Sequence, residues 1–172
     1  MIRHSESEFN KMANVFPDQQ FFQETAKLKL HFNHAYIDSS LSEEGQALCL
    51  KTGLPGDYVG GNRELDIIFV SPLNRTLQTA DLLIKSNKLS VKKIIVLPEL
   101  TEVLSKICDF SEEMGSKKHK YQHFDFSQMK RFIQQSGFIQ DEDSWQDALV
   151  DQEHFHKIAA KDKNAYRYLM IL

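Results

Sequence analysis

The sequence has few of the residues that mark secreted, fibrous or membrane proteins. Two cysteines are too few for a disulfide framework, so we expect reduced thiols in the cytoplasm. Seven glycines and four prolines, with no repeated period, indicate neither a linker nor a repeat array. No apolar run approaches the roughly 18 residues that span a membrane. Residues 1–8 carry a histidine and two acids, unlike a signal peptide.

The sequence also lacks a strong excess of charge of either sign. Lysine and arginine total 21 against 24 acids, a net charge of -3, which argues against a dedicated nucleic-acid binder. A composition of 41% hydrophobic and 26% charged residues is typical of a globular protein. The 172 residues fit a single domain that spans residues 1–172 and encloses its own core.

Short apolar segments alternate with amphipathic ones along the chain. The expected strands are residues 65–70, 94–97 and 166–172, and residues 55–62 are expected to form a loop. Helices are expected after the capping serines Ser5, Ser42 and Ser71, after Ser144, and over residues 127–135. The helix after Ser71 carries an apolar stripe at helical spacing, formed by Leu73, Leu77, Ala80 and Ile84. Strands that are apolar throughout are typical of parallel sheets covered on both faces. The pattern predicts an α/β fold, a three-layer sandwich with a mainly parallel central sheet flanked by helices.

Basic side chains occur at two expected strand-to-helix junctions. Arg3 and His4 come before the first helix, and Arg75 lies in the first turn after the strand at residues 65–70. Ligands of open α/β sheets bind at the carboxyl ends of strands, where helix N-termini favour anions. An arginine can hold two phosphate oxygens, and a neutral imidazole can accept a phosphoryl group. An arginine in a first helical turn opposes the macrodipole, which suggests that its charge serves a ligand.

Four motifs resemble those of one known family. Residues 3–10, R-H-S-E-S-x-x-N, resemble the R-H-G-E-S-x-x-N signature of the histidine phosphatase superfamily, also called phosphoglycerate-mutase-like. Residues 38–45 resemble its D-x-x-L-[ST]-x-x-G segment, and residues 71–80 its S-x-L-x-R-[AT]-x-Q-T-A segment. Residues 98–102 are similar to its P-x-L-x-E segment. The four occur in the family's order.

The resemblance implies a role for each matching position. His4 would be the phosphorylated nucleophile, with Arg3 and Arg75 as the phosphate clamp and Asn10 as a further phosphate contact. Glu102 would donate a proton to the leaving oxygen, a contribution of about 10²–10⁴-fold for a positioned acid. Phosphoryl transfer depends mainly on positioning and charge, so neither a metal nor another cofactor is implied.

The sequence also departs from the family. Ser5 replaces the glycine of the first motif, and Phe9 stands where the mutases have a tryptophan, which favours a phosphatase over a mutase. The family's second catalytic histidine follows a late strand in a motif like S-H-G, and residues 165–172 end where it would come. Only two residues precede Arg3, so we expect a domain that is incomplete at both edges.

We therefore predict a phosphomonoester hydrolase that forms a phosphohistidine on His4. Its substrate would be a phosphorylated small molecule or a phosphoprotein, with no nucleic-acid or membrane partner. Two alternatives stay open: a catalytically impaired phosphate- or phosphoprotein-binding pseudophosphatase, and a phosphoglycerate-mutase-type phosphotransferase. Glu102 and the nearby Glu99 could each be a solvated surface acid instead. The sequence predicts no particular oligomeric state.

Other clusters are assigned to surface or packing. The histidine pairs at residues 31 and 34, 119 and 123, and 154 and 156 have spacings that could bind zinc, but no cysteine or acid completes a site. Residues 117–121 form a short basic patch that we interpret as a solvated loop. Trp145 belongs to a stripe that is expected to pack in a core or lid.

Overall fold

A three-stranded parallel sheet lies at the centre of the computed structural model, which describes residues 1–15, 36–54, 63–102, 107–136 and 168–171. The strands are β1 (Glu64–Val70), β2 (Ser90–Val96) and β3 (Tyr168–Ile171), and their order across the sheet is β2-β1-β3. β1 is paired on both sides, to β2 and to β3. Its run of leucine, isoleucine, phenylalanine and valine suits a strand enclosed on both sides.

The edge of β2 is extended by one residue from a distant segment. The backbone of Asp125 accepts from the Val96 N–H at 2.9 Å and donates to the Ile94 carbonyl at 2.7 Å. This short parallel bridge fixes the start of the next helix beside the sheet.

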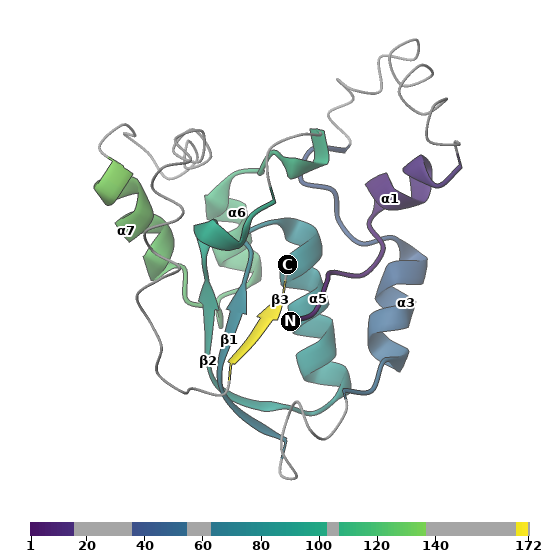
Figure 1. Ribbon diagram of the computed structural model, residues 1–172, viewed down its shortest axis with the longest axis horizontal. Helices are drawn as coiled ribbons and strands as arrows, with labels where there is room; N and C mark the ends of the chain where they lie inside the picture. Colours follow the sequence, from purple (N-terminus) through teal and green to yellow (C-terminus); the bar gives the residue numbers. More distant parts are fainter. Residues whose placement is uncertain (16–35, 55–62, 103–106, 137–167, 172) are drawn as a thin grey trace.

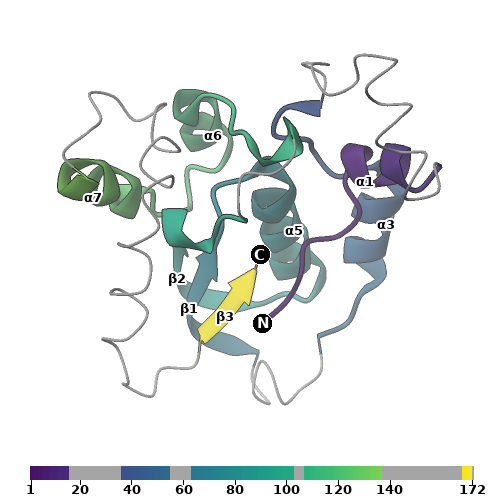
Figure 2. The ribbon, with the colours of Figure 1, turned by 45° about the horizontal axis from the view of Figure 1, so that its top comes forward.

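One helical layer covers the sheet next to β1. Helix α5 (Asn74–Ser86) connects β1 to β2, and its Leu77 and Ala80 are fully buried in the core with Ile68. Helix α3 (Glu43–Lys51) packs on α5, and the short helix α1 (Glu8–Ala13) lies beside α3 (Figures 1 and 2). The stripe that the sequence predicts for α5 is confirmed.

The remaining helices lie toward the β2 side of the sheet. They are α6 (Met114–Lys120) and α7 (Ser127–Ser136), with two short 3-10 turns at Pro98–Leu100 and Ile107–Asp109. Figures 1 and 2 show α7 beside β2 and α3 on the opposite side of the molecule. Met114 and Met129 bring α6 and α7 into the same hydrophobic core as β1. The predicted α/β architecture, a parallel sheet flanked by helices, is confirmed.

Several predicted segments lie outside the described residues. They are the helix after Ser144, with Trp145, the loop at residues 55–62, and the histidine pairs at 31 and 34 and at 154 and 156. The strand predicted at residues 166–172 is described as β3, over four of these positions. Within the described part of the chain, none of the helices has the length and apolar character needed to cross a membrane.

The first helix begins two residues later than the sequence predicts. Ser7 caps α1, accepting from the Asn10 N–H at 3.1 Å, while the Asn10 side chain accepts from the Ser7 N–H at 3.3 Å. The expected cap, Ser5, donates to the Gly45 carbonyl at 2.8 Å instead. A tertiary contact therefore takes the hydroxyl that a local capping box would have used, and the prediction is wrong by one half-turn.

The start of α5 also differs from the prediction. Leu73 is the N-cap and offers no side-chain acceptor, so the predicted cap, Ser71, is wrong. The Ser71 hydroxyl is buried without a hydrogen-bond partner among the described residues. Asp38 supplies the missing acceptor from a distant segment, since its carboxylate accepts from the Asn74 N–H at 2.7 Å.

Candidate active site

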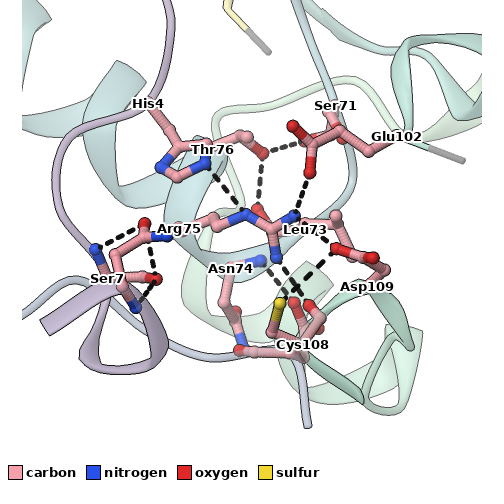
Figure 3. Close-up of polar contacts among 12 residues, drawn as sticks. His4, Ser7, Ser71, Leu73, Asn74, Arg75, Thr76, Glu102, Cys108 and Asp109 are labelled. Carbon is pink, nitrogen blue, oxygen red and sulfur yellow. Dashed lines mark hydrogen bonds and ion pairs between the residues drawn. The ribbon is translucent and has the colours of Figure 1, made fainter. Parts of the chain in front are cut away.

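Three segments bring polar groups together at the carboxyl end of β1. The N-terminal segment contributes His4, the first turn of α5 contributes Arg75, and the 3-10 turn at Ile107–Asp109 contributes Cys108 and Asp109. Figure 3 shows the His4 and Asp109 side chains and the Cys108 carbonyl around the Arg75 guanidinium, and Glu102 at the same NH2 nitrogen as Asp109. Only residues 71–73 separate β1 from α5, so Arg75, the second residue of that helix, lies near the end of the strand, where it contacts His4 of the N-terminal segment.

The hydrogen bonds of His4 define its protonation pattern. Nδ1 lies 2.6 Å from the carbonyl oxygen of Ser5, which can only accept, so Nδ1 carries the proton. Nε2 lies 3.2 Å from Arg75 Nε, which can only donate, so Nε2 presents a lone pair. The ring is thus a neutral imidazole with its nucleophilic nitrogen directed at the guanidinium.

The surroundings of His4 favour this neutral form. Burial lowers the pKa of the imidazole below its ordinary 6.5, and the positive charges of Arg75 and Arg3 lower it further. The Ser5 carbonyl and the Glu102 carboxylate act in the opposite direction without reversing the shift. At neutral pH the side chain, which is 8% exposed, is therefore unprotonated at Nε2.

Arg75 is surrounded by acceptors although it is only 2% exposed. Its NH2 nitrogen lies 3.1 Å from the buried Asp109 carboxylate and 3.2 Å from Glu102, and its NH1 nitrogen donates to the Cys108 carbonyl. A buried arginine requires such partners, because an unpaired charge in the interior is costly. The buried Asp109 and Cys108 contacts hold the plane of the guanidinium, whereas Glu102 contacts it with a side chain that is 54% exposed.

The two carboxyl groups of the fourth motif have different environments. Glu102 has a half-exposed side chain and pairs with Arg75, as its predicted place in the site requires. Glu99 is more enclosed: burial raises the pKa of its carboxyl, and one of its oxygens has no hydrogen-bond partner among the described residues. Glu102 is therefore the member of the pair that the fold brings to the cluster of His4 and Arg75.

Arg3 and Asn10 are placed less directly. Arg3 is exposed and precedes His4, whose pKa its charge helps to lower. Asn10 uses its side-chain oxygen to close the capping box of α1 with Ser7. That contact orders the start of α1, and the predicted contact of Asn10 with phosphate stays a prediction.

The second motif holds the N-terminal segment in place. Ser7 and Leu41 form an antiparallel bridge, and Gly45 of α3 approaches the backbone of Glu6 so closely that a Cβ would lie 2.1 Å from its carbonyl oxygen. Gln78 of α5 accepts from the Leu41 N–H at 2.7 Å, which ties the same segment to the third motif. Motifs distant in sequence are thus parts of one scaffold around His4.

Sequence reasoning missed two features of the site. Asp109 lies in the stretch after Thr101, where no clear periodicity predicts structure, so nothing marked it as an Arg75 partner. Lys117 was assigned to a solvated loop, and this prediction is wrong: it lies in α6, is 1% exposed and forms an ion pair with Asp38. The burial of Lys117 could have been found from its spacing, because it follows the apolar Met114 by three residues and so lies on the same, core-facing side of the helix.

The predicted surface role of one histidine pair can be compared with the structure. His119 is exposed, and His123 is half-exposed, stacks edge-on with Phe124 and lies 3.2 Å from Asp81. Over the described ranges, no group of three His, Cys, Asp or Glu side chains is arranged to hold a metal ion.

Comparison with protein families places the chain. The family model "Histidine phosphatase superfamily (branch 1)" matches residues 24–148. The chain belongs to the histidine phosphatase superfamily. The matched range contains the motifs at residues 38–45, 71–80 and 98–102, whereas His4 precedes it. The argument for His4 in this histidine phosphatase superfamily member therefore depends on the geometry around Arg75.

Comparison with individual proteins adds little. No curated protein matches the sequence. Among the solved structures, ten chains match. One is described as "Mycobacterial hydrolase 1", with 17% sequence identity and a TM-score of 0.38 over 100% of this chain and 71% of that one. A likeness this distant carries no argument about activity.

Proposed function

We propose that this histidine phosphatase superfamily member hydrolyses phosphate monoesters through a phosphohistidine on His4. The observation that supports it best is the His4 ring itself, a buried neutral imidazole with its proton on Nδ1 and its Nε2 lone pair beside a buried arginine. A purely structural histidine at a strand end has no need of that combination. Arg75 would draw the phosphate anion to within reach of Nε2.

The proposed reaction has two steps. The Nε2 lone pair forms a bond to phosphorus while the ester P–O bond breaks, and Glu102 protonates the leaving oxygen. Water then attacks phosphorus and loses a proton to Glu102, and the P–N bond breaks to return the lone pair to Nε2. In the first step the substrate phosphate takes the edge of Arg75 that Glu102 occupies in this structure, which leaves the Glu102 carboxyl next to the leaving group.

The alternative of a phosphate-binding module depends on the same arginine. The terminal nitrogens of Arg75 already bind Asp109, Glu102 and the Cys108 carbonyl, so a phosphate competes with Glu102 for part of the guanidinium. A protein that only binds phosphate would use the same clamp without the phosphohistidine. The two functions therefore differ in whether His4 becomes covalently modified.

Labelling with a radioactive aryl phosphate tests the proposal. We expect protein-bound phosphate that is lost in acid and stable in alkali, accompanied by release of the aryl alcohol. His4→Asn should abolish the label, and Arg75→Lys should reduce the rate of labelling by about 10²-fold or more, because it removes a preorganised fork. His123→Asn changes a half-exposed histidine outside the site; it is the matched control and should be labelled as the parent protein is.

The outcomes separate the two functions. If the folded protein takes up no label and shows no turnover, the phosphatase proposal is wrong. Phosphate binding detected by calorimetry in such a protein, and weakened in Arg75→Lys, would establish the binding module in its place.

A further inference from the structure

A buried ion pair near the start of α5 connects α6, the second motif and the turn from β1 into α5. Lys117 of α6 and Asp38 of the second motif are 1% exposed each, and the lysine ammonium contacts the Asp38 carboxylate. No step of the proposed reaction uses either group. A buried charge pair adds little net stability, because removing two charges from water costs about as much as their attraction returns. Its contacts indicate what it does.

Asp38 holds the beginning of α5. One carboxylate oxygen accepts from the Asn74 N–H at 2.7 Å, and the Asp38 backbone carbonyl accepts from the Asn74 side chain at 3.3 Å. Leu73, the N-cap, has no side chain that could do this. Asp38 itself has a φ of 47°, a left-handed conformation that an aspartate tolerates better than most residues. Asn74 directly precedes Arg75, so this contact sets where the arginine leaves the helix.

Lys117 fixes the loop before that helix. Its ammonium donates to the Pro72 carbonyl at 2.9 Å and to the Ser111 hydroxyl at 2.6 Å, in addition to its contact with Asp38. Three acceptors match the three N–H bonds of an ammonium group. Lys117 thus holds the Pro72 backbone within the turn from β1 into α5, and its partner Asp38 holds Asn74 at the end of that turn.

The pair also reaches the segment that orients the guanidinium. The second oxygen of Asp38 accepts from the Glu112 N–H at 2.9 Å, and the Glu112 side chain accepts from the Asn74 amide at 3.0 Å. Residues 111 and 112 follow Asp109, which binds the Arg75 NH2 nitrogen. The backbone that carries Arg75 and the backbone that carries its carboxylate partner are therefore tied to the same two charges.

We propose that the buried Lys117–Asp38 pair positions Arg75 for phosphate binding, by fixing the first turn of α5 and the Asp109 segment relative to one another. Lys117 and Asp38 are positioning residues, which act on phosphate only through Arg75. The proposal rests on the proposed function in one respect, that Arg75 binds phosphate. A misplacement of a clamp by about 1 Å can cost about 10²-fold in rate, so the pair should matter although it touches no substrate.

Inorganic phosphate binding, measured by calorimetry, tests the proposal in two backgrounds. Lys117→Met should weaken phosphate binding at least about tenfold when Arg75 is present, and by less than about twofold when Arg75 is already lysine. Lys120→Met, which changes an exposed lysine of the same helix, is the matched control and should leave binding unchanged. Equal weakening in both backgrounds, or none, would overturn the proposal, since a general loss of structure does not depend on Arg75.

Two additions decide the matter if a variant or a ligand fails. Where Lys117→Met does not fold, Asp38→Asn replaces it, because the amide keeps the size of the side chain while it removes the negative charge and one acceptor oxygen. Where the parent binds no phosphate, the NMR signal of the Arg75 Nε–H decides: an unchanged signal in Asp38→Asn overturns the proposal, and a shifted or broadened one supports it. Absence of label on His4 with phosphate binding retained counts against the phosphatase alone.

Discussion

At the scale of single residues, the protein uses burial to control charge. His4 is kept neutral by an interior position beside two arginines, whereas the charge of the buried Arg75 is balanced by the carboxylates of Asp109 and Glu102. A neutral imidazole beside a charged guanidinium places a nucleophile next to an anion-binding group. The arrangement needs no unusual residue, only a histidine whose two ring nitrogens face an acceptor and a donor.

The titration of His4 follows from these contacts. In the free protein we expect the His4 ring to titrate below pH 6.5, observed by NMR of its ring protons. Arg3→Gln should move this pKa upward, because it removes one of the charges that disfavour imidazolium. Arg131→Gln, an exposed position on α7, should not move it.

The same shift affects folding. A histidine whose pKa is lowered in the folded protein binds fewer protons there than in the unfolded chain. Its contribution to the free energy of unfolding is therefore complete above pH 6.5 and falls as the pH drops toward the pKa of the folded protein. A His4 that titrates at or above 6.5 would contradict the neutral, buried imidazole.

At the scale of elements, α3 is seated directly on the N-terminal segment. The contact is between Gly45 and the backbone of Glu6, and Ser42 next to it accepts from the Gly45 N–H at 3.0 Å while its own N–H donates to the Glu6 carbonyl at 3.0 Å. The close approach brings the cap of α3 and the turn after His4 within hydrogen-bonding reach. The second motif thus serves two purposes, because its serine caps α3 and its glycine allows α3 to pack on the N-terminal segment.

Substitution of this glycine should separate the two elements. In Gly45→Ala the new Cβ would overlap the Glu6 carbonyl, and the backbone cannot yield, so we expect a loss of about 1–3 kcal/mol or more in the free energy of unfolding. Gly115→Ala on α6 is the matched control, since its Cβ meets nothing within 4 Å.

The control should gain up to about 1 kcal/mol, because alanine restricts the unfolded chain and favours helix. Denaturant unfolding of both variants measures the difference. Equal stabilities for the two would show that α3 can move away from the N-terminal segment without cost.

At the scale of the whole molecule, one hydrophobic core joins β1, β2, α5, α6 and α7. The catalytic groups proposed above lie at its edge, where β1 ends, so the position of Arg75 depends on how α5 sits on the sheet. Leu77 lies two residues after Arg75 in α5, is fully buried and belongs to that core.

Truncation of this leucine should weaken the entire fold. Leu77→Ala removes buried methyl groups and leaves a cavity, and we expect a loss of about 2–5 kcal/mol in the free energy of unfolding. Leu48→Ala, at a leucine of α3 that is 58% exposed, should cost less than about 0.5 kcal/mol. Thermal and denaturant unfolding measure both, and a Leu77→Ala protein as stable as Leu48→Ala would refute this core.

The sequence by itself determined the main elements of the sheet and several of the residues that meet in the candidate site. Continuous apolar runs predicted β1 and β2, and the spacing of Leu73, Leu77 and Ala80 predicted α5, because burial of apolar faces leaves a periodic record. The motifs likewise predicted that His4, Arg75 and Glu102 belong together, and the fold brings these three side chains into contact or near contact.

Only the tertiary structure decided which groups satisfy one another. Local pattern assigned caps to Ser5 and Ser71, yet distant partners took over both positions, the first through Gly45 and the second through Asp38. Asp109 and Lys117 became part of the site for the same reason. Hydrogen bonds and ion pairs depend on distance in space, which periodicity along the chain does not record, and so the buried charges around Arg75 had to be found in the fold.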